Sequence, residues 1–210
     1  MSGATPSKKA ERFWDGEVPW VSPKDMKRDF LCDSQDHVSL AALSDTTLSL
    51  INEGAVLIVV RGMILARDIP IAINLRPVTI NQDMKALIPK KNDVTGPYVW
   101  AALYLAKPVL SSLVRTAGHG TRKLDTPDLM QFEIPVPDPH TLNKVTSIVE
   151  HRRLSIERRQ ASKHLLDHLF AVVLAKAFDT TLTRSWRESH MKELLQEMEQ
   201  QAKALKEASA

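Results

Sequence analysis

The 210-residue sequence predicts an α+β protein, in which a mixed, mostly antiparallel sheet domain precedes a long helical region. Three observations support this prediction. Short β-rich runs follow one another from residue 55 to residue 88, separated by turn-forming residues. Apolar residues then recur at helical spacing from residue 141 onwards. Proline and glycine are both absent after Pro139. The predicted domains are therefore 1–140 and 141–210.

The first domain is expected to begin with loops. Residues 1–54 contain several turn-forming prolines and glycines, together with Trp14 and Trp20, which are expected to pack these loops. Strands of a curved sheet are predicted over Val56–Val60, Ile69–Ile73, Val78–Ile80 and Met84–Ile88.

Two helices and a further strand complete the predicted first domain. Tyr98–Ala106 follows a Gly-Pro pair and ends before Pro108, which is typical of a helix. Thr126 is predicted to cap a short helix that has Pro127 in its first turn. A strand over Gln131–Val136 is predicted to follow it.

The second domain is predicted to be helical throughout. A helix over residues 141–178 would span about 57 Å at roughly 1.5 Å per residue, which is more than a single core of this size requires. A second helix is predicted over residues 184–206. Both have apolar faces suited to a helical hairpin or to a coiled coil or bundle between chains. The predicted dimer and partner residues are Leu142, Val145, Val149, Ile156, Leu166, Leu169, Val173, Leu194, Leu195 and Met198.

Composition limits the class of protein. A hydrophobic content of 43% is enough for a globular core. The single cysteine, Cys32, excludes an internal disulfide framework and fits a reducing cytoplasm. Neither a signal peptide nor a membrane span is predicted. The net charge is +3, but residues 1–140 contain 16 basic and 16 acidic residues. The overall charge therefore gives almost no support for nucleic-acid binding there, and any such binding would depend on local basic clusters.

One such cluster follows a glycine pair. Glycines at 118 and 120 would let the backbone approach a phosphate closely, while Arg122 and Lys123 supply positive charge. The alternative is an ordinary turn between two elements.

Further polar and cationic side chains in the loops could reach phosphates or base edges. Solvated surface charge is the alternative for each, since acids such as Asp25 and Asp29 lie among them. Gln82 has the amide donor and acceptor that suit adenine, but a tight turn with Asn81 in a hairpin is the alternative for this pair. The predicted DNA-binding set is Lys8, Lys9, Ser22, Lys24, Lys27, Arg28, Arg61, Arg67, Gln82, Gly118, His119, Gly120, Arg122 and Lys123.

The sequence contains no recognisable catalytic motif. It has no phosphate-binding loop ending in Lys-Ser or Lys-Thr, no Gly-x-Ser-x-Gly and no Asn/Asp-Pro-Pro-aromatic methylation motif. His164 and His168 have i,i+4 spacing but no evident third ligand, so a packing or solvent role is expected. No enzyme activity, metal site or bound cofactor is therefore predicted for this chain.

Several short segments occur in a fixed order. They are Gly3-Ala4-Thr5-Pro6-Ser7, Val18 to Met26, Val59-Val60-Arg61-Gly62, Ala72-Ile73-Asn74, Asn81-Gln82-Asp83, Gly118-His119-Gly120-Thr121, Ile134-Pro135-Val136-Pro137 and Ala177-Phe178. In this order the chain resembles one half of the DNA-specificity subunit of type I restriction-modification systems. The resemblance implies a target-recognition domain over residues 1–140 and a helical spacer over 141–210.

The resemblance also implies partners. Each recognition domain of this family grips one half of a split site in double-stranded DNA, so two half-length chains, or this chain and another specificity subunit, are expected to pair. A methyltransferase subunit that uses S-adenosylmethionine and a restriction subunit are expected to join them in the prokaryotic cytoplasm, away from the membrane. The alternative function is a truncated or inhibitory homologue that binds the methyltransferase or a full specificity subunit through its helices without reading DNA.

Overall fold

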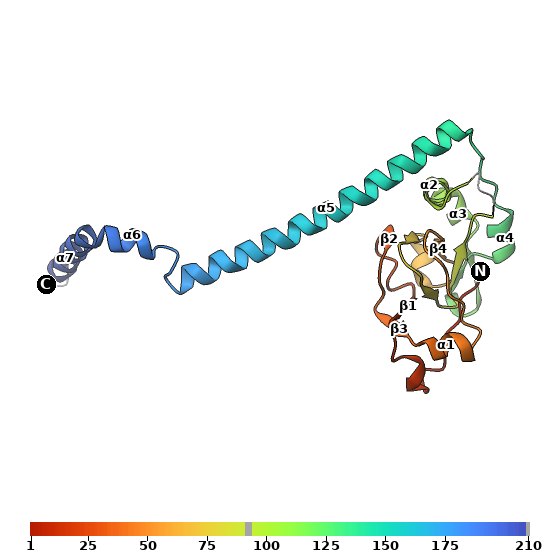
Figure 1. Ribbon diagram of the computed structural model, residues 1–210, viewed down its shortest axis with the longest axis horizontal. Coiled ribbons are helices and arrows are strands. Elements are labelled where there is room, and N and C mark those ends of the chain that lie inside the picture. The colour runs from red at the N-terminus through yellow and green to blue at the C-terminus, as the bar shows by residue number, and fades with distance from the viewer. Residues whose placement is uncertain (91–93, 209–210) are drawn as a thin grey trace. The chain divides into compact units, whose positions relative to one another are not determined.

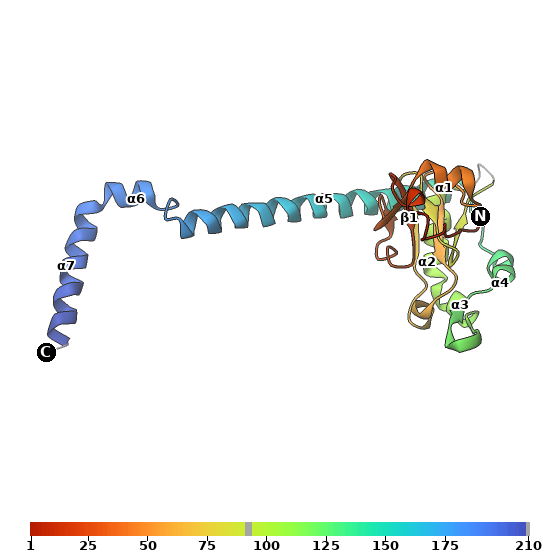
Figure 2. The same cartoon turned by 90° about the horizontal axis from the view of Figure 1, so that it is seen from below.

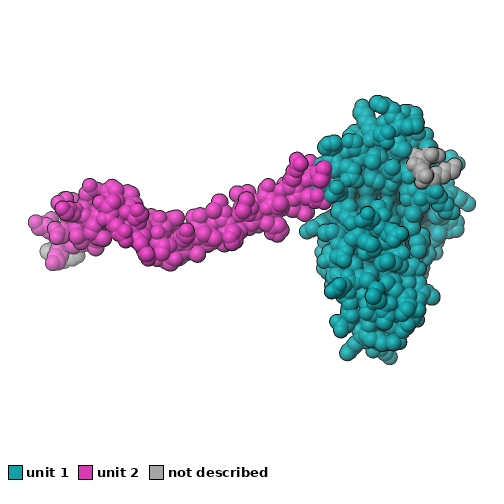
Figure 3. Space-filling view, viewed as in Figure 1, with its two compact units in different colours: residues 1–153 teal, residues 154–210 magenta. Residues whose placement is uncertain are grey.

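The computed structural model describes residues 1–90 and 94–208, apart from the side chains of His119 and Ala208. The chain divides into two compact units, residues 1–153 and residues 154–210, coloured separately in Figure 3. All strands of the described ranges lie in the first unit (Figure 1). The mixed α+β fold class is confirmed, and its sheets are mainly antiparallel.

The larger sheet has four strands in the order β2-β5-β4-β7. Its central strands, β4 (Val56–Val59) and β5 (Ile71–Asn74), pair antiparallel and are buried along their whole length. Strand β7 (Met84–Leu87) pairs antiparallel with β4, and β2 (Phe30–Leu31) pairs parallel with β5. The predicted strands of this region are confirmed within two residues at each end.

Two strands of the smaller sheet lie in a region for which only loops were expected, while the third lies within the predicted strand Val78–Ile80. Strand β1 (Val18–Val21) pairs antiparallel with β3 (Asp36–Val38) and parallel with β6 (Thr79–Ile80). A helical turn, η1 (Glu11–Phe13), and helix α1 (Leu40–Asp45) accompany it. Strands this short, one of them containing a proline, give no periodic signal, and their stability comes from partners that are distant in sequence.

Aromatic residues pack the core of this smaller sheet. Phe13, Trp20 and Val38 belong to a hydrophobic cluster separate from the main core. The rings of Trp14 and Trp20 meet edge to face with centroids 5.1 Å apart. The expected packing of the N-terminal loops by the two tryptophans is confirmed.

Helices α2 (Gly96–Leu105) and α3 (Lys107–Ser112) follow the sheets, and α2 lies against β4 and β5. Thr95 caps α2 by accepting the Tyr98 N–H, and the Trp100 indole donates to the Ile71 carbonyl at 3.2 Å. A Cβ on Gly96 would lie 2.1 Å from the Gly54 carbonyl oxygen, so only glycine fits where α2 begins against the Gly54 backbone.

A two-stranded hairpin and a short helix end the sheet region. Strands β8 (Arg115–Thr116) and β9 (Arg122–Lys123) pair antiparallel around the turn η3 (Gly118–Gly120). Another turn, η2 (Met63–Ala66), lies beside β9. Helix α4 covers Thr126–Gln131.

Two predictions for this region are wrong. The N-cap of α4 is Asp125 and not Thr126, and it makes no side-chain capping bond. The segment predicted as the strand Gln131–Val136 forms no strand, since Gln131 ends α4 and two prolines in the following segment cannot donate to a ladder. A tertiary hydrogen bond holds it instead, from the Tyr98 hydroxyl to the Pro135 carbonyl at 2.6 Å.

Helix α5 (Pro139–Phe178) begins two residues before its predicted start. The Asp138 carboxylate accepts the His140 and Thr141 N–H groups and the Thr141 hydroxyl, and these bonds, first that of the hydroxyl, hold the pKa of Asp138 below its usual range.

The C-terminal region contains two helices, α6 (Arg184–Ser189) and α7 (Met191–Ala208), where the sequence predicts a single helix over 184–206. They separate at His190. None of the described helices has the length and apolar character that a bilayer span requires.

Candidate nucleic-acid interface

The ends of several strands meet at one edge of the first unit. The Val21 carbonyl at the end of β1 accepts the Asn81 N–H at 2.9 Å. The Asp83 carbonyl accepts the N–H groups of Val60 and Arg61, just after β4, at 2.8 and 3.2 Å. The ends of β1, β4 and β6 and the start of β7 therefore lie together.

Gln82 is exposed at the apex of a turn at this edge. The Asn81 side chain closes the turn, accepting the Asp83 N–H at 3.1 Å. The hydroxyl of Thr5 donates to the Gln82 side-chain oxygen, and a Cβ on Gly3 would collide with the Asn81 carbonyl at 2.0 Å. The tight turn is confirmed, but it is not a hairpin, because it connects β6 of one sheet with β7 of the other.

The β8–β9 hairpin reaches the same edge. The Gly62 N–H donates to the Arg122 carbonyl at 3.0 Å, and the Leu124 N–H donates to the Val60 carbonyl at 2.9 Å. The glycines of its tip differ. Gly120 has φ +76°, which disfavours other residues, whereas Gly118 has open space where a Cβ would lie. The His119 side chain lies outside the described residues.

Two ion pairs join this hairpin to helix α4. The Lys123 ammonium contacts the Asp125 carboxylate, and the Arg115 guanidinium lies 3.1 Å from the Asp128 carboxylate. The hydrogen bond from Lys123 holds the pKa of Asp125 below its usual range. Arg122 donates to the Thr116 hydroxyl at 2.7 Å. Arg115 is not among the residues predicted from the sequence, because only the strand pairing places it opposite Lys123.

The loop between β1 and β2 contains a second group of cations. Lys24, Lys27 and Arg28 are exposed and line a depression of about 270 Å³. Ser22 is buried, and its hydroxyl donates to the Asp25 carboxylate at 2.9 Å. The expectation that Ser22 presents its hydroxyl to DNA is thus not supported by its position, since it closes the loop from within.

The acids of this loop have structural partners. Asp25 accepts the Ser22 and Gln35 N–H groups, each at 2.9 Å. Asp29 pairs with Arg152 of α5 at 2.5 Å, and this hydrogen bond raises the pKa of Arg152. The contacts of these two acids therefore hold the conformation of the loop, while the loop's cations are exposed to solvent.

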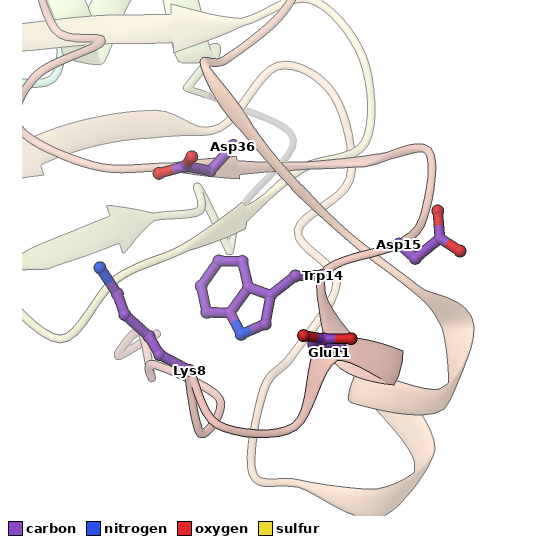
Figure 4. Close-up of a pocket in the computed structure, with 5 residues that line it drawn as sticks. All are labelled: Lys8, Glu11, Trp14, Asp15 and Asp36. Carbon is purple, nitrogen blue, oxygen red and sulfur yellow. The ribbon is translucent and has the colours of Figure 1, made fainter.

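The remaining predicted cations lie apart from the β8–β9 hairpin. Lys8 lines a depression of about 450 Å³ together with Trp14 and the carboxylates Glu11, Asp15 and Asp36 (Figure 4). Lys9 is exposed on the same loop, and Arg67 is exposed at the end of η2. The acids around Lys8 make its surroundings the least favourable for a phosphate.

The structure thus separates the predicted DNA-binding residues into groups. Those brought together at the strand-end edge are Arg61, Gln82, Gly118, Gly120, Arg122 and Lys123. We call this set, together with Arg115, the strand-end cluster.

The predicted helix-packing residues also fall into two groups. In the first unit Leu142 and Val149 are buried, Val145 is half-buried, and Thr146 forms a hydrogen bond with Thr95 at 2.8 Å. The start of α5 therefore packs on the chain's own core. The others lie in the second unit, where Ile156 and Leu194 are half-buried and the following residues are exposed: Leu166, Leu169, Val173, Leu195 and Met198.

The described residues contain no group of three or more His, Cys, Asp or Glu side chains that could hold a metal ion. His164 and His168 are exposed on α5.

The fold and the cluster together describe an α+β domain that gathers cations and a glycine-tipped hairpin at its strand ends. The family model of the type I restriction modification DNA specificity domain matches residues 1–150. The chain therefore belongs to the type I restriction-modification DNA specificity family, as the sequence motifs predicted.

Two curated relatives are specificity subunits of type I restriction enzymes. The EcoR124I/EcoR124II subunit of Escherichia coli is 34% identical over 149 residues, which cover 70% of this chain and 37% of that protein. The MjaIX subunit of Methanocaldococcus jannaschii is 26% identical over 171 residues, covering 80% of this chain and 38% of that protein. The chain spans less than two fifths of either relative's length.

Solved structures agree on the fold. The HsdS subunit from Thermoanaerobacter tengcongensis aligns with a TM-score of 0.52 and 16% identity over 84% of this chain and 41% of that one. A chain from a structure on complex assembly and conformational transition of the type I R-M system aligns with a TM-score of 0.55 and 19% identity over 85% and 42%. At these identities the likeness concerns the fold alone.

Proposed function

We propose that this chain is a non-catalytic subunit that recognises one half of a bipartite DNA site within a type I restriction-modification complex. The observation that carries the proposal is the strand-end cluster, which brings Arg122, Lys123 and the exposed Gln82 side chain together on segments joined by backbone hydrogen bonds. Cations of this kind hold the phosphate backbone, while an amide can read a base edge.

The chemistry would then belong to other subunits. Methyl transfer from S-adenosylmethionine would be performed by a methyltransferase subunit and cleavage by a restriction subunit. The exposed apolar residues of the second unit support pairing with a second copy of the chain or with another specificity subunit, since such a surface is unfavourable in water. A pair of identical chains would read a palindromic split site.

Gel shifts with the purified chain, in the presence and absence of the methyltransferase subunit, test this proposal. A DNA-reading subunit gives a shift that depends on DNA sequence and strengthens with the partner. An inhibitory homologue gives none and suppresses the shift of a full specificity subunit, which would contradict the proposal.

A further inference from the structure

We propose that Asp125 and Asp128 are specificity-determining residues, which hold the hairpin cations in place and weaken binding to DNA of unmatched sequence. This inference rests on the proposed DNA-recognition function and adds a role for two acids within the interface.

The hairpin needs a counter-charge. Arg115 and Lys123 are directly opposite one another in the β8–β9 register, with Arg61 bridged to Lys123 on the other side. Like charges at opposite positions of a strand pair repel each other. The carboxylates of Asp125 and Asp128 contact these two cations and offset the repulsion.

The two acids form their ion pairs with the hairpin and not within helix α4. Asp125 occupies the N-cap position but makes no side-chain capping bond. Asp128 lies in the first turn, where its Oδ2 is buried and forms an ion pair with Arg115. The ion-pair partners of both side chains are thus the hairpin cations, and asparagine, which has the same shape but no charge, is the replacement that tests their charge.

The same carboxylates oppose a phosphate at this surface. DNA that approaches Lys123 or Arg115 meets a negative charge beside each cation. A unit charge about 6 Å from a phosphate changes affinity roughly threefold in water, so the two acids together lower it roughly tenfold. Matched DNA, positioned by base contacts, can exchange phosphate for carboxylate at the cations. Unmatched DNA, which binds almost entirely through charge, bears the full effect.

The test uses the full chain in complex with its methyltransferase subunit. Dissociation constants are measured for a duplex selected by the wild-type complex and for a random duplex, across a range of salt concentrations. The double variant D125N/D128N is expected to bind random DNA roughly tenfold more tightly. Its salt dependence should steepen by up to about 0.9 for each phosphate newly contacted, and the ratio of selected to random affinity should fall.

Asp45→Asn is the matched control. It removes the carboxylate of another Arg–Asp pair, that of Arg12 and Asp45 at 3.1 Å. Asp45 ends α1, which lies at the opposite end of the first unit from α3, the helix that leads into the hairpin (Figure 2). This variant is expected to leave both affinities and the salt dependence unchanged within about twofold, because exposed pairs contribute little.

The result distinguishes the inference from the proposed function. If the wild-type complex selects a sequence but the double variant binds random DNA no more tightly, the inference is wrong. Weaker binding together with a lower unfolding midpoint would mean that the acids only stabilise the fold, and it also overturns the inference. A wild-type complex that shows no sequence preference contradicts the proposed function itself, and the inference then fails with it.

Discussion

Replacing Val149 with alanine is expected to lower the free energy of unfolding by about 1.5 kcal/mol. Val149 is 4% exposed and belongs to the main core. Removing its two methyl groups forfeits about 0.8 kcal/mol each, and the cavity left behind adds to the loss. Alanine's higher helix propensity returns about 0.5 kcal/mol. Val109 of helix α3 is 56% exposed, so Val109→Ala is expected to change stability by less than about 0.5 kcal/mol.

Urea unfolding followed by tryptophan fluorescence measures the difference, since three of the four tryptophans lie in the first unit. The Val109 variant controls for helix propensity, because both substitutions replace valine with alanine within a helix. Equal destabilisation by the two variants, or none by Val149→Ala, would refute the conclusion that α5 begins on the chain's own core.

Three further predictions concern the fold, the assembly and the interface. Gly96→Ala is expected to destabilise the protein by about 1–3 kcal/mol in thermal melts through overpacking, whereas Gly118→Ala should have almost no effect. Equal melting temperatures for the two variants would contradict the close contact between Gly96 and the Gly54 carbonyl. Leu169, 55% exposed, should contribute to pairing, so Leu169→Ser should lower the mass measured by light scattering towards the monomer, and an unaltered mass would contradict this role. Lys123 keeps the pKa of Asp125 below its usual value. Their ion pair is therefore fully formed at every pH above the usual aspartate pKa, and it is lost only as the pH falls through the lowered pKa. The difference in unfolding midpoint between the wild type and Asp125→Asn should therefore be the same at pH 7.5 and at pH 5.5.

The sequence predicted the elements that have strong local signals. The β-branched runs that become β4 and β5 are buried on both faces, and such runs need no knowledge of their neighbours to be recognised. The long helix was equally predictable, because a segment without proline or glycine and with recurring apolar residues has few alternatives. What failed were elements defined by distant partners, such as β1, which pairs with β6 some sixty residues later.

The candidate interface was predicted in its residue types but not in its grouping. Sequence reasoning selected Lys123 and Gln82, yet nothing local shows that both lie near the end of β4. It selected Lys8 as well, which the fold places among carboxylates. Arg115 was missed because its importance comes from a cross-strand position. Asp125 was missed because its segment was interpreted only as the start of a helix capped by Thr126.

Selection of bound duplexes from a random DNA pool by the complex of this chain and its methyltransferase subunit tests the central claim most directly. The account predicts enrichment of a defined half-site, and replacement of Lys123 by glutamine should weaken binding to all sequences while preserving the enriched bases. A pool that stays random after selection by a folded, assembled complex would contradict the claim that this chain reads DNA.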